Sequence, residues 1–157
     1  MTRPASRRRV AILLVGIAAI SAFIWKVLPP TEEFDLSALR ETGWVVVEYG
    51  NADCPPVEET WAGWTVRVPA SRYACTSTPT FDGWTRDDFR GPAGENVAER
   101  VRKKVTAHVH GCGPPVFAFF YGSDADLDAE YERRKADPTI EDPVQSLLRK
   151  RHPECAQ

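Results

Sequence analysis

The chain has 157 residues, enough for one domain and an additional segment, and its formal net charge of −2 is unevenly distributed. Five of its 20 Lys and Arg residues precede Pro29, where there is no acidic residue. The rest therefore has 15 basic against 22 acidic residues, a net charge of −7. Such an acidic part lacks the clustered Lys and Arg that neutralise phosphates, so we expect no nucleic-acid partner.

The N-terminal segment predicts attachment to a membrane. Residues 1–9 include Arg3 and Arg7–Arg9 and no acidic residue, and Val10–Leu28 is apolar apart from Lys26. A helix of this length reaches about 28 Å, close to the hydrocarbon thickness of a bilayer. Basic residues before the span keep that end in the cytoplasm. We therefore predict a single-pass signal anchor over residues 10–28, in the inner or plasma membrane, with the domain in the periplasm or outside the cell.

A cleaved signal peptide is the alternative interpretation of the same segment. Ala19 and Ser21 form an acceptable cleavage pair, but the apolar run continues past them and exceeds the usual length of a cleaved signal. We favour the anchor for that reason. The stretch 29–41, which opens with two prolines, is expected to be a stiff linker with a short helical turn over Phe34–Arg40.

Residues 42–157 are predicted to form an extracytoplasmic β-rich domain that ends in helices. β-Branched and aromatic runs bounded by Gly, Pro and Asn indicate its strands. In Trp64–Val68, alternation places Trp64, Val66 and Val68 on one buried face. The predicted strands are Trp44–Tyr49, Trp64–Val68, Tyr73–Thr78, Trp84–Phe89 (a strand or an extended arm), Lys103–His110 and Val116–Tyr121. Over Val97–His110 a helix is the alternative, because Val97, Val101 and Val105 fit its period. A loop is predicted over Asn51–Gly63 and a turn over Gly111–Pro115.

Two helices are expected after the last strand. Ser123 and Asp126 have the spacing of a capping box that opens a helix ending near Ala136. Asp142 and Pro143 open a second helix that ends near Lys150, with proline where its missing N–H costs nothing. The predicted fold class is α+β: a small, mostly antiparallel β domain with one or two C-terminal helices, preceded by a single N-terminal transmembrane helix.

The first strand of this domain is expected to be covered on both faces. Alternation puts Trp44, Val46 and Glu48 on one face, and Val45, Val47 and Tyr49 on the other. We predict that Trp44 lies in the core, beneath the helix that starts at Asp124. Glu48 is expected where that covered face meets water, so that its replacement should cost little.

Four widely spaced cysteines on the oxidising side of the membrane indicate disulfides. The absence of a C-x-x-C spacing argues against a thioredoxin-like redox centre. Three pairings are possible. We favour Cys54 with Cys75, because the two flank the Trp64–Val68 strand, and this leaves Cys112 with Cys155.

Candidate residues for chemistry or binding are few. His108 and His110 would share one face of a strand, with Cys112 next in the series, but zinc needs three or four convergent ligands and the usual spacings are absent. We therefore predict neither a metal nor a cofactor. Trp61 and Trp84 are the candidate ligand-binding residues, since tryptophans that do not belong to the core can line a binding surface.

Several short motifs resemble those of a family of uncharacterised bacterial domains, which are secreted or attached to membranes. They are Gly43-Trp44-Val45, Pro55-Pro56, Thr76-Ser77-Thr78 in place of Thr-Ser-Ser, Gly83-Trp84 and Phe120-Tyr121-Gly122-Ser123. The resemblance covers about residues 42–127. It implies architecture and location and no activity.

These observations favour a binding or interaction module of the cell envelope over an enzyme. Its expected partners are the membrane, through the single span, and another envelope protein. The alternative is an envelope hydrolase or metal-binding protein that uses His108 and His110. A hydrolase lacks the Gly-x-Ser-x-Gly signature in this sequence.

Overall fold

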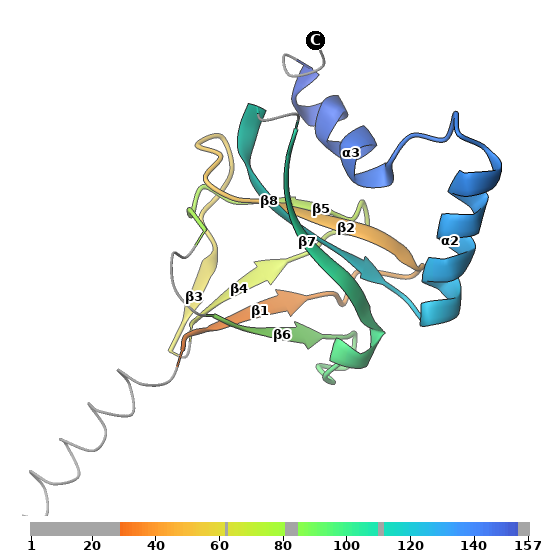
Figure 1. Ribbon diagram of the computed structural model, residues 1–157. Coiled ribbons are helices and arrows are strands. Elements are labelled where there is room, and N and C mark those ends of the chain that lie inside the picture. The colour runs from red at the N-terminus through yellow and green to blue at the C-terminus, as the bar shows by residue number, and fades with distance from the viewer. Residues whose placement is uncertain (1–28, 62, 81–84, 110–111, 154–157) are drawn as a thin grey trace, which may run out of the picture.

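The computed structural model describes residues 29–61, 63–80, 85–109 and 112–153. For residues 107–109 and 112–114 the backbone is described and the side chains are not. Strands dominate this part of the chain, and two helices follow them (Figure 1). The elements are β1 (Thr31–Asp35), β2 (Gly43–Glu48), β3 (Glu58–Thr60), β4 (Gly63–Arg67), β5 (Tyr73–Cys75), β6 (Arg86–Arg90), the 3-10 turn η1 (Ala98–Arg100), β7 (Val101–Val109), β8 (Cys112–Tyr121), α2 (Asp124–Ala136) and α3 (Pro143–Arg151).

The strands form two four-stranded sheets. Sheet A has the order β3-β4-β1-β6 and sheet B the order β5-β2-β8-β7. β1 runs parallel to β4 and to β6, and β2 runs parallel to β5. The other pairings, β2 with β8, β3 with β4 and β7 with β8, are antiparallel. The α+β class is therefore confirmed, but the expectation of a mostly antiparallel domain is wrong.

The segment predicted to be a linker supplies an inner strand of sheet A. Residues 31–35 form β1 between β4 and β6, so the helical turn expected over Phe34–Arg40 is wrong and the domain begins before residue 42. The two glutamates of β1 hide its alternation. Glu32 and Phe34 point inward nevertheless, and Phe34 is fully buried. β1 also accounts for two of the parallel pairings, which no local turn signal reveals because parallel strands are joined by long connections.

The main core lies between the two sheets and is rich in aromatic rings. Phe34 of β1 stacks on Phe89 of β6, with ring centroids 5.0 Å apart. Phe119 of β8 meets both rings edge-on, at 5.7 Å from Phe34 and 5.1 Å from Phe89. Val45 and Val47 of β2 complete the contact from sheet B. Aromatic pairs in such geometries add to the stabilisation that burial provides.

Both predicted helices form with the predicted caps. The Ser123 side chain accepts from the backbone N–H of Asp126, and the Asp126 carboxylate accepts from the backbone N–H of Ser123, a complete capping box for α2. The Asp142 carboxylate caps α3, with Pro143 at its first position. Capping groups of this kind satisfy N–H groups that have no partner inside the helix.

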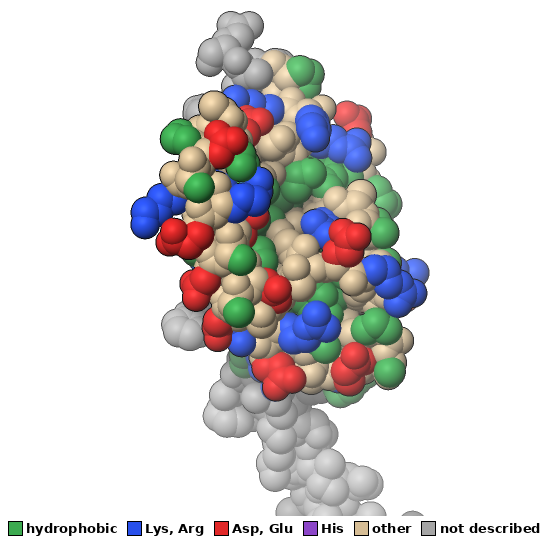
Figure 2. All heavy atoms as spheres, turned by 90° about the vertical axis from the view of Figure 1, so that its right-hand side faces the viewer, with side chains coloured by type: hydrophobic (Ala, Val, Ile, Leu, Met, Phe, Trp, Pro, Cys, Tyr) green, Lys and Arg blue, Asp and Glu red, His purple; other side chains and the backbone are tan. Residues whose placement is uncertain are grey.

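The helix that covers the outer face of sheet B is α3, whereas α2 was expected there. Val144 and Leu148 of α3 are buried against Trp44 and Val46 of β2. α2 has no buried residue and adds only the partly buried Leu127 to this contact. It lies at the side of the domain (Figure 1), and acidic and basic side chains alternate over the face that carries it (Figure 2). Trp44 is only 7% exposed, so its predicted place in the core is confirmed.

Several sequence boundaries agree closely with the structure. β2 and β4 lie within one residue of their predicted ranges, and β7 confirms a strand in the stretch where a helix was the alternative. The loop predicted over Asn51–Gly63 contains the short strand β3, and β8 begins at Cys112, inside the predicted Gly111–Pro115 turn. The transmembrane prediction for residues 10–28 falls outside the described residues. Within the described ranges, no helix has the length and apolar character needed to span a bilayer.

Candidate functional site

A disulfide joins the proline-containing loop to the end of β5. Cys54 and Cys75 are bonded, with their Cα atoms 5.8 Å apart, which confirms the favoured pairing. Backbone hydrogen bonds reinforce the link: Asn51 N–H donates to the Thr76 carbonyl at 3.0 Å, and Ser77 N–H donates to the Pro55 carbonyl at 3.1 Å. The loop is thus attached to the sheet by covalent and hydrogen bonds. The Cys112 side chain and Cys155 fall outside the described residues, so their pairing stays a prediction.

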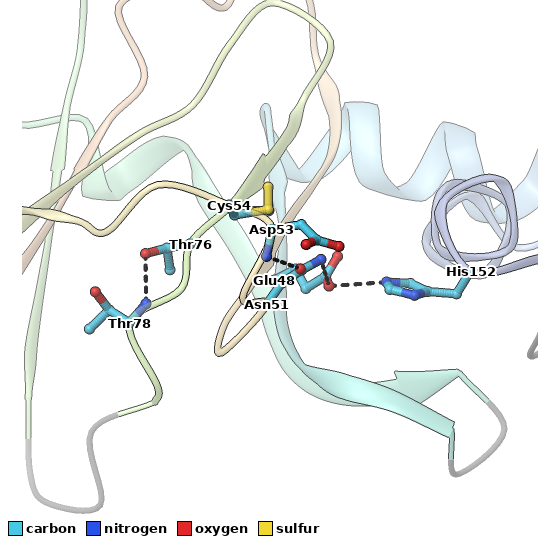
Figure 3. The surroundings of a disulfide bond; sticks show 8 residues. Glu48, Asn51, Asp53, Cys54, Thr76, Thr78 and His152 are labelled. Carbon is cyan, nitrogen blue, oxygen red and sulfur yellow. Dashed lines mark hydrogen bonds and ion pairs between the residues drawn. A yellow bond between two sulfur atoms is a disulfide. The ribbon is translucent and has the colours of Figure 1, made fainter.

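Glu48, the last residue of β2, is fully buried beside this disulfide (Figure 3). Its Oε1 accepts a hydrogen bond from Asn51 Nδ2 at 2.7 Å and lies 3.0 Å from Nε2 of His152. The expectation that Glu48 sits where the covered face meets water is therefore wrong. The physical reason is that the C-terminal end of α3 covers this position, which the sequence of β2 alone does not show.

His152 brings the end of the described chain onto the sheet. It is the C-terminal cap of α3, its backbone N–H donates to the Leu148 carbonyl at 2.8 Å, and its side chain is 12% exposed. Figure 3 shows the imidazole directed from the helix towards Glu48, with Asn51 on the other side of the carboxylate. A buried carboxylate is stable only where such partners replace water. The cluster Glu48–Asn51–His152 therefore fastens α3 to the disulfide-bonded loop.

A second carboxylate lies on the opposite side of β2, between the sheets. Tyr49 Oη donates to Glu32 Oε1 at 2.6 Å, and Trp64 Nε1 donates to the same oxygen at 3.0 Å. Burial raises the pKa of Glu32, the two hydrogen bonds partly oppose this effect, and the negative charge of Asp87 adds to it. Burial and the neighbouring Glu32 likewise raise the pKa of the Tyr49 phenol. One oxygen of Glu32 thus links β1, which carries this residue, to the residue that follows β2 and to β4.

Glu32 and Tyr49 border a hollow of about 160 Å³. Asp87 and Thr106 also line it, and Lys104 Nζ pairs with the Asp87 carboxylate at 2.8 Å. Ligand pockets for small molecules are usually about 300–1,000 Å³. The hollow has room for a few waters or a small ion, and its polar groups serve mainly to join the strands.

Trp61 is the predicted binding residue that the structure places on the surface. It lies in the turn between β3 and β4 and is 84% exposed. Trp84, His110 and the side chain of His108 fall outside the described residues, so their predicted roles stay predictions. Among the residues that are described, no three His, Cys, Asp or Glu side chains converge in a way that could hold a metal ion.

Sequence reasoning missed both carboxylates, the fully buried Glu48 and the half-buried Glu32. One signal was available: Glu48 directly follows three valines in a strand whose two faces were both predicted to be covered. An acid in such a position requires partners. Glu32 gave no signal, because its strand was itself mistaken for a linker.

No protein-family model matches the sequence, and no curated protein matches it. The fold is similar to the crystal structure of a Bacillus anthracis protein described as a candidate lipoprotein. The TM-score is 0.53, and the match covers 82% of this chain and 95% of that chain. The two sequences are 13% identical, so the likeness concerns the fold alone.

Proposed function

We propose that this protein is a membrane-tethered binding domain of the bacterial cell envelope, displayed on the oxidising side of the membrane. The observation that carries the proposal is the Cys54–Cys75 disulfide. Disulfides persist in the periplasm and outside the cell, whereas cytoplasmic thiols are kept reduced. The bond is consistent with the orientation expected from the basic residues that precede Val10–Leu28.

The fold comparison supports the same location. A domain of this fold occurs in a protein described as a candidate lipoprotein, a class that a lipid attaches to a membrane. This chain has no cysteine near the end of its apolar segment, so a lipid would have no thiol to modify there. We propose that the apolar segment itself is the tether and that the domain follows it after two prolines.

A binding role is supported by the distribution of polar groups. One carboxylate oxygen of the half-buried Glu32 and one of the buried Glu48 have internal partners, and both residues contribute to joining elements of the fold. The exposed indole of Trp61 offers a large amphipathic surface, the type of side chain that is enriched in interfaces. The resemblance to uncharacterised secreted or membrane-attached bacterial domains agrees with the proposed location. Its partner would be a component of the envelope.

Fractionation of cells that express the full chain tests the location. We expect the protein to sediment with membranes, to resist release by salt or carbonate, and to be digested by protease added to spheroplasts. A soluble form lacking the first 20-odd residues would contradict the tether. Mass spectrometry of unreduced peptides should recover the Cys54–Cys75 cross-link, and the same sites found as free thiols in protein alkylated at lysis would contradict the oxidising location.

A pull-down from envelope extract tests the binding role. The bait is the full chain in mild detergent, and the matched control is Trp61→Ser, which changes an exposed side chain and should leave the fold intact. A specific envelope component captured by the parent supports the role.

A further inference from the structure

The strands of sheet A that carry Trp61 also begin beside the proposed tether. In the register of the sheet, Thr31 at the start of β1 lies opposite Gly63 at the start of β4 and opposite Arg86 at the start of β6. A Cβ added to Gly63 would lie 1.9 Å from the Thr31 carbonyl oxygen, which shows how closely these two strand ends approach. Figure 1 shows the start of β1, the β3–β4 turn and the start of β6 together at one end of the sheet. We call this the tether end of sheet A.

The chain length places the tether end close to the bilayer. Pro29 and Pro30 are the only residues between Leu28, the end of the apolar segment, and Thr31. Three residue steps extend the backbone by at most about 10 Å. β4 lies next to β1, about 4.8 Å away, and Thr31 is opposite Gly63 at the start of β4. Trp61 precedes Gly63 by two residues, so it lies at the same end of the sheet as Thr31, where the tether joins the domain. The polar headgroup layer on each side of a bilayer is about 5–7 Å thick, within this reach.

Two exposed side chains at the tether end suit that layer. Trp61 is 84% exposed, and tryptophan is enriched at membrane–water interfaces because it has an apolar ring with a polar N–H. Arg86 is also exposed, and its guanidinium donates to the Thr31 hydroxyl at 3.1 Å. A cation at this height attracts anionic lipid headgroups. Trp64, three residues after Trp61, is instead turned inward by its bond to Glu32.

We propose that the tether end of sheet A rests on the membrane surface, with the Trp61 indole in the headgroup layer and Arg86 facing lipid phosphates. The occupant of this surface is the bilayer that holds the tether. The contact fixes the orientation of the domain, so that sheet B and its helices point away from the membrane. This inference rests on the proposed function, since without a tether nothing brings the tether end to a bilayer.

Quenching by brominated lipids tests the contact in the full chain. The protein is reconstituted in phosphatidylcholine vesicles containing an anionic lipid, in a Trp25→Phe background that removes the tryptophan of the apolar segment. Subtracting the emission of an additional Trp61→Phe variant gives the contribution of Trp61. An additional Trp64→Phe variant gives the matched control for an indole turned inward. Bromine is placed either near the headgroup or near the end of the acyl chain.

The expected result is that bromine near the headgroup quenches the Trp61 contribution about twofold more than bromine at the chain end, as for an interfacial indole. The Trp64 contribution should change little with either lipid. If the vesicles retain the protein after a carbonate wash but the Trp61 contribution is unaffected, the membrane contact is wrong and the tether stands. If the protein does not float with the vesicles, both proposals are overturned.

Discussion

The two faces of β2 present different solutions to the burial of one strand. Its inner face, with Val45 and Val47, meets the aromatic rings of sheet A and β8. Its outer face, with Trp44 and Val46, meets α3, a helix of nine residues that contributes Val144 and Leu148. The inner face is covered by a whole sheet, whereas the outer face receives its buried helical residues from one short helix, with the partly buried Leu127 of α2 beside them. A helix this short has little stability of its own and forms because it packs.

A carboxylate also lies beside the end of each face, half-buried Glu32 of β1 on the inner side and fully buried Glu48 on the outer side, and their partners differ in kind. Glu32, on the inner side, accepts from the neutral donors Tyr49 and Trp64. Glu48, on the outer side, has Asn51 and the ionisable His152. The inner carboxylate joins strands that are already held by the core. The outer carboxylate supplies a polar contact that fixes α3, where the apolar contact is small.

Phe34→Ala should have the largest effect, because it removes a fully buried ring from the inner face. We expect a loss of about 4 kcal/mol in the free energy of unfolding, from the lost transfer of the ring and the cavity it leaves between Phe89 and Phe119. Urea denaturation of the purified protein measures this loss. Phe34→Leu, which refills most of the space, is the control and should cost clearly less. Equal, small losses for both would show that the sheets are not closely packed here.

Trp44→Ala should cost somewhat less, about 3 kcal/mol, because the outer face is more thinly covered. Trp44 packs edge-on against Phe120, with centroids 5.9 Å apart, and is 7% exposed. Its buried Nε1 has no hydrogen-bond partner among the described residues, which reduces the net benefit of the native ring. The same denaturation experiment ranks it against Phe34→Ala. A loss below that of a surface substitution would mean that α3 does not dock.

Glu48→Ala should cost about 2 kcal/mol, since it leaves Asn51 and His152 without their shared acceptor in a buried site. The effect should concentrate in α3, so hydrogen exchange should show the amides of this helix less protected than those of β8. Glu48→Gln is the control: it keeps an acceptor for Asn51 and removes the charge opposite His152. Unchanged protection of α3 in the alanine variant would contradict the fastening role.

The parts of the fold that sequence could predict are those specified by neighbouring residues. The valine run of β2, the alternation of β4, the Ser123 and Asp142 caps and the pairing of Cys54 with Cys75 each depend on short-range patterns. Local patterns of this kind indicate an element and its ends without reference to the rest of the chain.

The parts that could not be predicted depend on distant partners. β1 has two acidic residues in five, and becomes a strand because β4 and β6 flank it and Phe34 fills the core. Glu48 becomes buried because the chain returns more than 90 residues later with α3 and His152. For the same reason α3, rather than the longer α2, covers Trp44: the nine residues of α3 carry the buried apolar pair, whereas α2 is charged along its length.

Glu32→Gln should have the smallest effect and a distinctive dependence on pH. Burial raises the pKa of Glu32 above its ordinary value of 4.5, so the folded protein holds this proton more tightly than the unfolded chain does. As the pH rises above 4.5, the unfolded chain releases the proton first, and the stability contributed by this group declines until the folded carboxyl has also ionised. Glutamine can accept from Tyr49 and Trp64 and does not ionise. The variant should therefore gain in stability relative to the parent as the pH rises from about 4 to about 7, measured as the difference between their urea midpoints at each pH.

Glu33→Gln, which changes the neighbouring acid on the other face of β1, is the control and should not reproduce this trend. A constant difference between parent and Glu32→Gln across that range would show that the inner carboxylate is hydrated, and that the contrast between the two faces of β2 does not extend to their acids.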